Sequence, residues 1–506
     1  MGDAFLEWLA RERPGEPVEV VETHISRVAF VGDRAYKCKK AVSFPFVDLS
    51  TPELRRRDCE REVALNRRFA PDVYLGVVDV TDPAGRVVDH AVEMTRMPPS
   101  RRLAALAREG ADPSGCLHAL ASRLADVHRN AATGGPVDDA ASADAVARLW
   151  EEAFAQTRGY EGRLIDRGRA RCVAALARRY LAGRRALFGA RVAAGRARDG
   201  HGDLLADDVF CLDDGPRALD CLEFDDRLRW CDVLADVAFL AMDLEYLGRP
   251  DLAAQFLSAY RGAAHDDWPA SLQHFYVAYR AHIRMKIACL RGDRDAAEAH
   301  LALAHRHLEQ GRVRLVLVGG APATGKTTLA RLLADETGWP VLRTDAVRRE
   351  VLRREPAMRG APRGAGLDEG VYEPRARTRV YDVVLSRARA LLSSGESVVL
   401  DASWSEPAWR AHAAAVAADT ASDLVALRCV APPDLAAARA AARAREGRDA
   451  SDADSRLAVA LARRFAPWPG AVEIDTANGI TAALRAVRSA VLAPRCAGPP
   501  VATGGA

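Results

Sequence analysis

The sequence predicts a protein of mixed α/β and α+β class with two structural units, and three observations carry this prediction. The first hundred residues alternate short β-like runs with turns, and residues 101–198 then carry apolar side chains three and four apart, as amphipathic helices do. Beyond residue 311, apolar runs alternate with helical segments, which is typical of a doubly wound parallel sheet. We therefore expect units at 1–310 and 311–493, followed by a disordered tail at 494–506.

Length and composition exclude several classes of protein. The 506 residues exceed one ordinary domain, and 49% hydrophobic with 28% charged residues is the balance of a soluble globular protein. Lys and Arg number 72 against 69 Asp and Glu, so we expect neither long nucleic acid nor a membrane as a partner, and the oligomeric state is open. The first residues carry Asp3 and Glu7, and no stretch approaches the ~18 apolar residues of a membrane span. The expected location is the cytoplasm.

The ten cysteines are scattered along the chain. They form no Cys-x-x-Cys pair and no Cys/His cluster with zinc spacing. We expect them to be reduced core residues, because free cysteine commonly behaves as a small buried hydrophobe.

In the first half, a hairpin is predicted from Arg27–Val31 and Arg34–Cys38 around a Gly-Asp turn, with a helix beginning near Thr51. Short strands are expected again at Asp203–Phe224, and helices at 232–310.

In the second half, strands are predicted at Val313–Val318, Ser397–Leu400 and Leu424–Val430. The segment Arg353–Arg377 is rich in Gly, Pro and Arg and is expected to form a mobile loop.

The clearest motif is the segment GGAPATGKTTLA, which follows the first of these strands. Gly320, Gly325, Lys326 and Thr327 fit the P-loop (Walker A) pattern G-x-x-x-x-G-K-[ST], and a helical segment follows as the motif requires. Backbone amides, the helix start and the ammonium group would gather the phosphates of ATP, while the Thr hydroxyl would hold Mg²⁺. The residues expected to bind ATP here are Gly320, Ala321, Pro322, Ala323, Thr324, Gly325, Lys326, Thr327 and Thr328.

Two carboxylates follow later strand candidates. Asp345 lies in VLRTDAVR, about twenty residues after the glycine loop, with Arg348 one turn further on. This segment resembles the gluconate, shikimate and polynucleotide kinases and the zeta toxins, in which an Asp at this place meets the acceptor hydroxyl. The resemblance implies that Asp345 is the catalytic base, and a solvated helix start is the alternative. Asp401 ends the run SVVL and is expected to help hold Mg²⁺, with a helix cap as the alternative.

Two arginines lie four residues apart in LAAARAAARAREGRD. Arg439 and Arg443 resemble the lid arginines of those kinases. Arginine suits a lid because its planar guanidinium group can clamp phosphate oxygens. A solvated helix face is the alternative, so the ATP-binding role of both residues is a hypothesis.

A second acidic motif lies in RDGHGDLLADDVFCLDDGPRALDCLEF. It resembles the aminoglycoside phosphotransferase branch of the protein-kinase-like fold, which has the pattern H-G-D-x-x-x-x-N and a later metal-binding Asp. The resemblance implies that Asp203 is the catalytic base and that Asp208 and Asp220 bind metal. Asp208 replaces the Asn of the family and adds negative charge, which keeps an oxygen ligand but weakens the expectation of efficient transfer. His201 is expected to be structural.

Upstream, AYKCKK places Lys37 and Lys39 on one face of a strand, and Glu62 lies in the next helix. In kinases a strand lysine pairs with a helix glutamate and binds ATP phosphates, which implies ATP-binding roles for Glu62 and for Lys37, our first choice of the two lysines. The glycine-rich phosphate cover of kinases is not evident, because the preceding turn reads THISR.

The segments VETHISRV, AYKCKK, HGDLLADDVF, CLEFDDRLRWCDV and GGAPATGKTTLA, in this order, resemble the bacterial bifunctional aminoglycoside phosphotransferase/ATP-binding proteins over nearly the whole chain. The resemblance implies a kinase-like domain of two lobes, joined near Met94–Pro99, followed by a P-loop NTPase domain. Both would use ATP and Mg²⁺ to phosphorylate a hydroxyl of a small molecule. The alternatives are a nucleotide-binding regulatory protein with a degenerate first domain, and a nucleic-acid-end or toxin-like kinase.

Overall fold

The computed structural model describes residues 4–23, 25–44, 47–354, 373–446 and 465–494. The expected loop at 353–377 and the expected tail from 494 fall largely outside these residues. The chain forms two compact units, and each unit is assembled from segments that are distant in sequence. The first unit contains Met1–Ile165, Phe188–Trp268 and Tyr276–Ala304, and the second contains Asp166–Leu187, Pro269–Phe275 and His305–Ala506.

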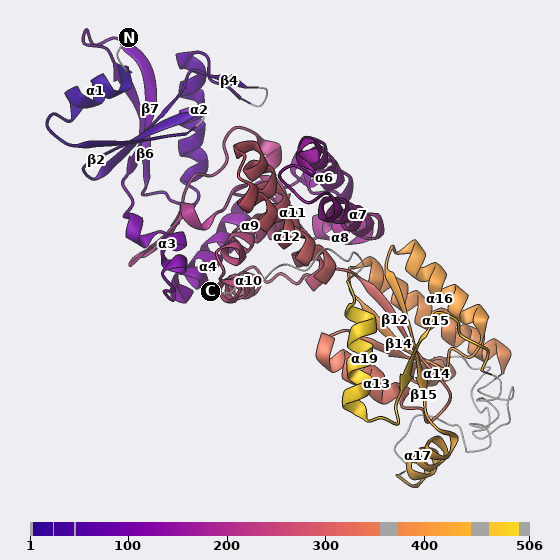
Figure 1. The fold of residues 1–506 in the computed structure, drawn as a ribbon. Coiled ribbons are helices and arrows are strands. Elements are labelled where there is room, and N and C mark those ends of the chain that lie inside the picture. The colour runs from indigo at the N-terminus through magenta and orange to yellow at the C-terminus, as the bar shows by residue number, and fades with distance from the viewer. Residues whose placement is uncertain (1–3, 24, 45–46, 355–372, 447–464, 495–506) are drawn as a thin grey trace. The chain divides into compact units, whose positions relative to one another are not determined.

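The first unit begins with an antiparallel sheet of five strands in the order β1-β2-β3-β7-β6 (Figure 1). The expected hairpin is confirmed, because β2 pairs with β3 and Gly32 turns between them with a φ of +53°. The strands are β1 Val18–Glu22, β2 Ser26–Val31, β3 Arg34–Lys39, β6 Tyr74–Thr81 and β7 Val87–Thr95, with a separate hairpin of β4 Ser43–Phe44 and β5 Val47–Asp48.

Each face of this sheet is covered by one helix. α1 (Ala4–Glu12) packs Trp8 against one face, and α2 (Pro52–Asn66) packs Val63 against the other. Successive side chains of a strand point to opposite faces, so the sheet supplies a separate apolar core to each helix. The expected helix start is confirmed, because the Thr51 side chain accepts a hydrogen bond from the first turn of α2.

After β7 the chain passes through residues 96–98 into a mostly helical region, as the sequence predicts. At its centre lies α9, whose residues 233–242 are all buried. None of the helices described has both the length and the apolar character needed to cross a bilayer. The helices from 99 to 310 are η1 Pro99–Arg101, α3 Leu103–Arg108, α4 Ser114–Asn130, α5 Pro136–Ala140, α6 Ala143–Thr157, η2 Arg158–Tyr160, α7 Arg167–Gly183, α8 Arg185–Ala193, η3 Ala206–Asp208, η4 Asp226–Leu228, α9 Val233–Tyr246, α10 Pro250–Ala263, α11 Ala270–Arg291 and α12 Arg294–Gln310.

Two short antiparallel strand pairs frame the acidic motif of the first unit. The pairs are β8 Ala197–Asp199 with β11 Trp230–Asp232, and β9 Val209–Leu212 with β10 Gly215–Ala218. Because the acidic residues lie in the connections between these strands, the pairs fix where the connections begin and end.

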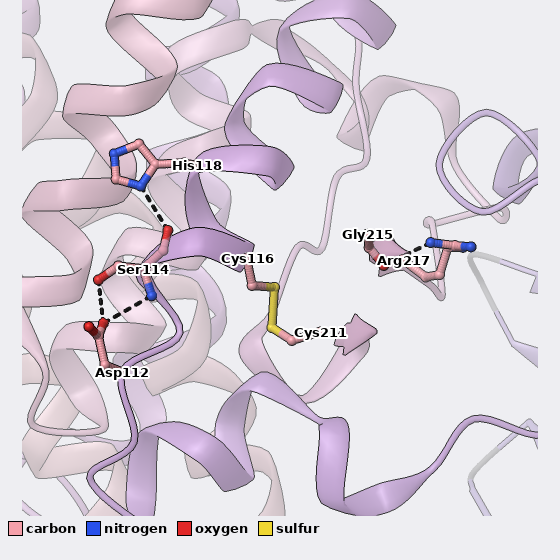
Figure 2. Close-up of a disulfide and its surroundings, with 7 residues drawn as sticks. All are labelled: Asp112, Ser114, Cys116, His118, Cys211, Gly215 and Arg217. Carbon is pink, nitrogen blue, oxygen red and sulfur yellow. Dashed lines mark hydrogen bonds between the residues drawn. A yellow bond between two sulfur atoms is a disulfide. The ribbon is translucent and has the colours of Figure 1, made fainter. Parts of the chain in front are cut away.

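The expectation that all cysteines are reduced is wrong for Cys116 and Cys211. Cys116 in α4 and Cys211 in β9 form a disulfide, with their Cα atoms 5.6 Å apart (Figure 2). They are 95 residues apart in sequence, and the fold brings them to bonding distance. Cys59, Cys221 and Cys289 are buried thiols, as expected.

The second unit contains a parallel sheet of five strands in the order β13-β14-β12-β15-β16. The strands are β12 Arg314–Gly319, β13 Val341–Arg343, β14 Val398–Asp401, β15 Asp423–Val430 and β16 Val472–Asp475. The chain starts in the middle of this sheet and moves to both edges, so the predicted doubly wound fold is confirmed.

Helices cover both faces of this parallel sheet (Figure 1). α13 and α19 contribute Leu329 and Val487 to a core with Val316, while α15 and α16 lie on the opposite face. The helices are α13 Lys326–Thr337, α14 Thr344–Arg354, α15 Pro374–Ser393, α16 Pro407–Asp419, α17 Pro433–Glu446 and α19 Ile480–Leu492.

The second unit also includes α7, a helix that precedes residue 311 in sequence. Within α7, Arg179 donates a hydrogen bond to the Ser422 carbonyl at 2.7 Å. Directly after α7, Arg184 donates one to the Thr420 carbonyl at 2.6 Å. A Cβ atom on Gly183 would lie 2.1 Å from the same Thr420 oxygen, so the close approach of α7 requires glycine.

We predict that Gly183→Ala destabilises the second unit by about 1–3 kcal/mol, because the new methyl group has to displace the Thr420 backbone. Urea unfolding of the full chain measures the effect. Gly189→Ala in α8 is the matched control, since nothing lies within 4 Å of its Cβ position and alanine favours a helix by ~1 kcal/mol. Equal unfolding of Gly183→Ala and wild type would contradict the packing described.

Candidate phosphotransfer sites

The glycine loop of the second unit connects β12 to α13, as the motif requires. Gly320, Ala323 and Gly325 have φ values of +137°, +64° and +89°, so the backbone is curled at three points. A Cβ atom on Gly320 would lie 2.4 Å from the Cys429 carbonyl oxygen, which makes glycine necessary there. The loop therefore has the tight backbone path that a phosphate cradle needs.

The ammonium group of Lys326 lies over this loop. It donates a hydrogen bond of 2.7 Å to the Ala321 carbonyl, which also accepts one of 2.8 Å from the Thr324 hydroxyl. Pro322 follows Ala321 in the loop and precedes Thr324. Thr328 lies in the first turn of α13. The Lys326 ammonium group is therefore folded back against the backbone of the loop.

Beside the loop lies a pocket of about 440 Å³. One wall is formed by the loop and the start of α13, and the other comes from α17, the residues after β16 and the start of α19. The lining residues are Ala323, Gly325, Lys326, Thr327, Thr328, Leu329, Leu332, Arg439, Ala442, Thr476, Gly479, Ile480 and Ala483. The pocket is polar where the loop lines it and apolar where leucine and isoleucine side chains line it. This suits a nucleotide whose phosphates lie on the loop.

Arg439 lies in this pocket, held by a residue that the sequence analysis missed. Its two guanidinium nitrogens donate to the Thr476 hydroxyl and carbonyl, both at 2.9 Å, and the Thr476 hydroxyl in turn lies 3.0 Å from the Thr324 carbonyl. Thr476 directly follows β16, and its place at the carboxyl end of a parallel strand was the available signal. Arg443 lies one turn further along α17, and its side chain is outside the described part of the structure.

Thr327 and Asp401, the expected magnesium ligands, lie within hydrogen-bonding distance of each other. The Thr327 hydroxyl donates a hydrogen bond of 2.8 Å to Asp401 Oδ2 at the end of β14, and Asp401 is 5% exposed. A buried carboxylate beside a hydroxyl is an all-oxygen donor set, which fits Mg²⁺. Arg343 also contacts both residues, and the sequence analysis did not single it out.

Asp345 lies in the first turn of α14, directly after β13. Its carboxylate accepts a hydrogen bond of 2.8 Å from Arg348. The neighbouring Thr344 hydroxyl donates to the Asp401 carbonyl at 3.3 Å. These contacts bring Asp345 to the same edge of the sheet as the glycine loop.

In the first unit, Lys37 lies between two carboxylates. Its ammonium group is 2.8 Å from Glu62 and 2.7 Å from Asp220. Burial alone lowers the pKa of Lys37, but Asp220 and Glu62 raise it well above its ordinary value. Lys39 contacts the other oxygen of Glu62 at 2.7 Å and also reaches Glu223, so Glu62 is held from two sides. The structure therefore brings the predicted Lys37, Glu62 and Asp220 together.

The loop that carries His201 and Asp203 is fixed by Asp236, which the sequence analysis missed. Its carboxylate accepts hydrogen bonds from the backbone amides of His201 and Gly202, at 2.9 and 2.8 Å. In the sequence, the sign that could have pointed to Asp236 is an acidic residue among apolar ones in the segment that forms α9. Burial lowers the pKa of His201 to about 4, and its Nε2 lies 3.0 Å from the Leu219 carbonyl next to Asp220. His201 is therefore uncharged at neutral pH, and its contact with the Leu219 carbonyl ties its loop to the segment before Asp220.

Asp203 and Asp208 are half-buried near each other and near Asp220. Burial raises the pKa of Asp203 to about 6, while Arg284 opposes the shift. Burial and the charges of Asp220 and Asp203 raise the pKa of Asp208 well above its ordinary value. Lys37 lowers the pKa of Asp220. Carboxylate oxygens are the ligands that Mg²⁺ prefers, and these three residues lie close enough to influence one another's charge.

The turn between β1 and β2 departs from the kinase pattern, as the sequence suggests. The Ser26 amide donates to the Thr23 hydroxyl at 2.9 Å, and the Thr23 amide donates to the Ser26 carbonyl at 2.8 Å. A hairpin closed in this way has no glycine-rich loop to wrap phosphates.

Two solved kinases are similar to separate parts of the chain. A putative kinase from Chloroflexus aurantiacus J-10-fl is 22% identical, with a TM-score of 0.29 over 36% of this chain and 100% of its own. A choline/ethanolamine kinase family protein from Mesorhizobium loti is 13% identical, with a TM-score of 0.38 over 60% of this chain and 90% of its own.

Two comparisons of sequence extend further. Residues 315–468 match the family described as AAA domain. The uncharacterized proteins Rv2004c of Mycobacterium tuberculosis and Mb2027c of Mycobacterium bovis are each 43% identical over 467 residues, which cover 91% of this chain and 93% of each relative. The chain therefore belongs to the family of these mycobacterial proteins.

Proposed function

We propose that this protein is an ATP-dependent kinase with two nucleotide-binding domains, one at 1–310 and one at 311–493, whose sites lie in the first and in the second compact unit respectively. Each unit would transfer the γ-phosphate of ATP to a hydroxyl group of a small molecule. The observation that carries the proposal is the curled glycine loop with Lys326 above it, at the polar end of a pocket of nucleotide size. We place the activity in the cytoplasm, where ATP is available.

In the second unit, the loop amides and Lys326 would bind the β- and γ-phosphates. Thr327 and Asp401 would hold Mg²⁺, which supplies charge neutralisation when bound. Asp345 would accept the proton of the acceptor hydroxyl. The hydroxyl oxygen would then bond to the γ-phosphorus while the bond between that phosphorus and the ADP oxygen breaks. Arg439 and Arg443 would neutralise phosphate charge from α17.

In the first unit, Lys37 would bind phosphate oxygens while Glu62 keeps its ammonium group in place. Asp208 and Asp220 would hold Mg²⁺. Asp203 would accept the acceptor proton, and the hydrogen bonds that the His201 and Gly202 amides donate to Asp236 would fix the loop that carries it.

A second candidate is a regulatory protein whose first unit binds nucleotide without transferring phosphate. Two observations favour it: burial beside Asp220 and Asp203 raises the pKa of Asp208, so the carboxyl group that stands in place of the family's Asn resists ionising, and the Thr23–Ser26 turn offers no glycine loop over the phosphates. The same second unit could also serve a nucleic-acid-end or toxin-like kinase, for which the near-neutral net charge of +3 allows only a short end as acceptor.

We predict that Asp203→Ala and Lys326→Ala each remove one of two activities. A screen of a metabolite library for phosphorylation, with ADP release as the measurement, would identify the acceptors. The loss of a general base is expected to slow its own reaction by about 10²–10⁴-fold, and loss of the loop cation by about 10²–10³-fold.

The double variant should retain neither activity, which controls for a contaminating kinase. If Asp203→Ala leaves every activity unchanged, the first unit is not a kinase and the regulatory alternative holds. If Lys326→Ala leaves both nucleotide affinity and turnover intact, the proposal for the second unit is wrong.

We also predict a pH dependence that reports on Asp203. Its pKa is raised to about 6, and a general base acts only when ionised, so kcat/KM of the first unit should fall roughly tenfold per pH unit below about pH 6 and level off above it. The profile is measured in the Lys326→Ala background. A flat profile from pH 5 to about pH 8 would argue against Asp203 as the base.

A further inference from the structure

Arg343 lies where the two expected magnesium ligands of the second unit meet. It is the last residue of β13 and lies opposite Asp401 in the parallel register. Its Nε donates a hydrogen bond of 3.2 Å to Asp401 Oδ2, and its Nη2 is 3.5 Å from the Thr327 hydroxyl oxygen. The Thr327 hydroxyl donates to the same Oδ2 at 2.8 Å. One guanidinium group therefore contacts both ligands at once.

The charges explain why a cation is needed at this place. Asp401 is 5% exposed at the end of a strand whose residues are all buried, and a carboxylate removed from water is costly without a partner. The Arg343 side chain is itself only 19% exposed, and a guanidinium stays protonated in proteins. Arg343 thus supplies the positive charge that Asp401 needs when no metal ion is bound.

The oxygen atoms that Arg343 contacts are the ones that Mg²⁺ would need. A magnesium ion demands close octahedral contact with its ligands, and a like-charged guanidinium at the same oxygens opposes its entry. A nucleotide changes this balance, because its phosphates bring ligands for the metal ion and negative charge that can receive the released arginine.

We propose that Arg343 is the built-in counter-cation of the magnesium site, so that the second unit takes up Mg²⁺ together with nucleotide and not before it. The proposal rests on the proposed function of this site, because Thr327 and Asp401 have to be the metal ligands. It assigns Arg343 a positioning role, in which the arginine keeps the site neutral and closed to free metal ions until ATP arrives.

The test is binding of Mn²⁺, as a paramagnetic substitute for Mg²⁺, to the nucleotide-free full chain. Electron paramagnetic resonance counts free Mn²⁺ during a titration. We expect Arg343→Met to bind one additional Mn²⁺ at least tenfold more tightly than wild type binds at this site. Arg343→Lys keeps the charge and should behave as wild type does.

Two controls assign the added site. Asp401→Asn in the Arg343→Met background should abolish the added Mn²⁺ binding, which separates this site from the acidic cluster of the first unit. Arg387→Met removes a positive charge that pairs with Glu350 in the same unit, and it should leave Mn²⁺ affinity unchanged. Arg343→Gln keeps an amide donor for Asp401 and takes the place of Arg343→Met if that variant does not fold.

Unchanged or weaker Mn²⁺ binding in both neutral variants would overturn the proposal, as would added binding that survives Asp401→Asn. The proposed kinase function fails by a different result, namely turnover that is insensitive to Lys326→Ala. Because the Mn²⁺ titration contains no nucleotide, its outcome does not depend on kinase activity.

Discussion

A carboxylate that is removed from water has to be neutralised, and both units of this protein are arranged around that constraint. In the first unit, Glu62 is fully buried and is held between Lys37 and Lys39. In the second, Asp401 is held by Thr327 and Arg343. In each case the contact joins residues from different elements, so the charge pairing also fixes where those elements meet. The positive groups that hold these carboxylates are also the ones suited to bind phosphate.

The two units neutralise their buried carboxylates in different ways. In the first site, burial raises the pKa of Asp203 and Asp208, and the charges of Asp220 and Asp203 add to the shift of Asp208. The second site pairs its buried carboxylate, Asp401, with Arg343 from the neighbouring strand.

The sequence predicts what is local and misses what depends on distant pairing. The glycine loop was predicted correctly because its spacing, its strand and its helix are contiguous. The kinase-like order of Lys37, Glu62 and Asp220 was found by resemblance. Asp236 was missed because its partners lie more than thirty residues earlier in the chain. Arg343 was missed because only the register of β13 against β14 brings it to Asp401, and the Cys116–Cys211 disulfide was missed for the same kind of reason.

The central claim is that one chain holds two separate sites for ATP with Mg²⁺. Equilibrium binding of a non-hydrolysable ATP analogue in the presence of Mg²⁺, measured by isothermal titration calorimetry, tests it most directly. Two molecules bound per chain are expected, with a single one remaining when Lys326 is replaced by alanine. A stoichiometry of one in the wild-type protein, or of two in that variant with unchanged affinities, would contradict the claim.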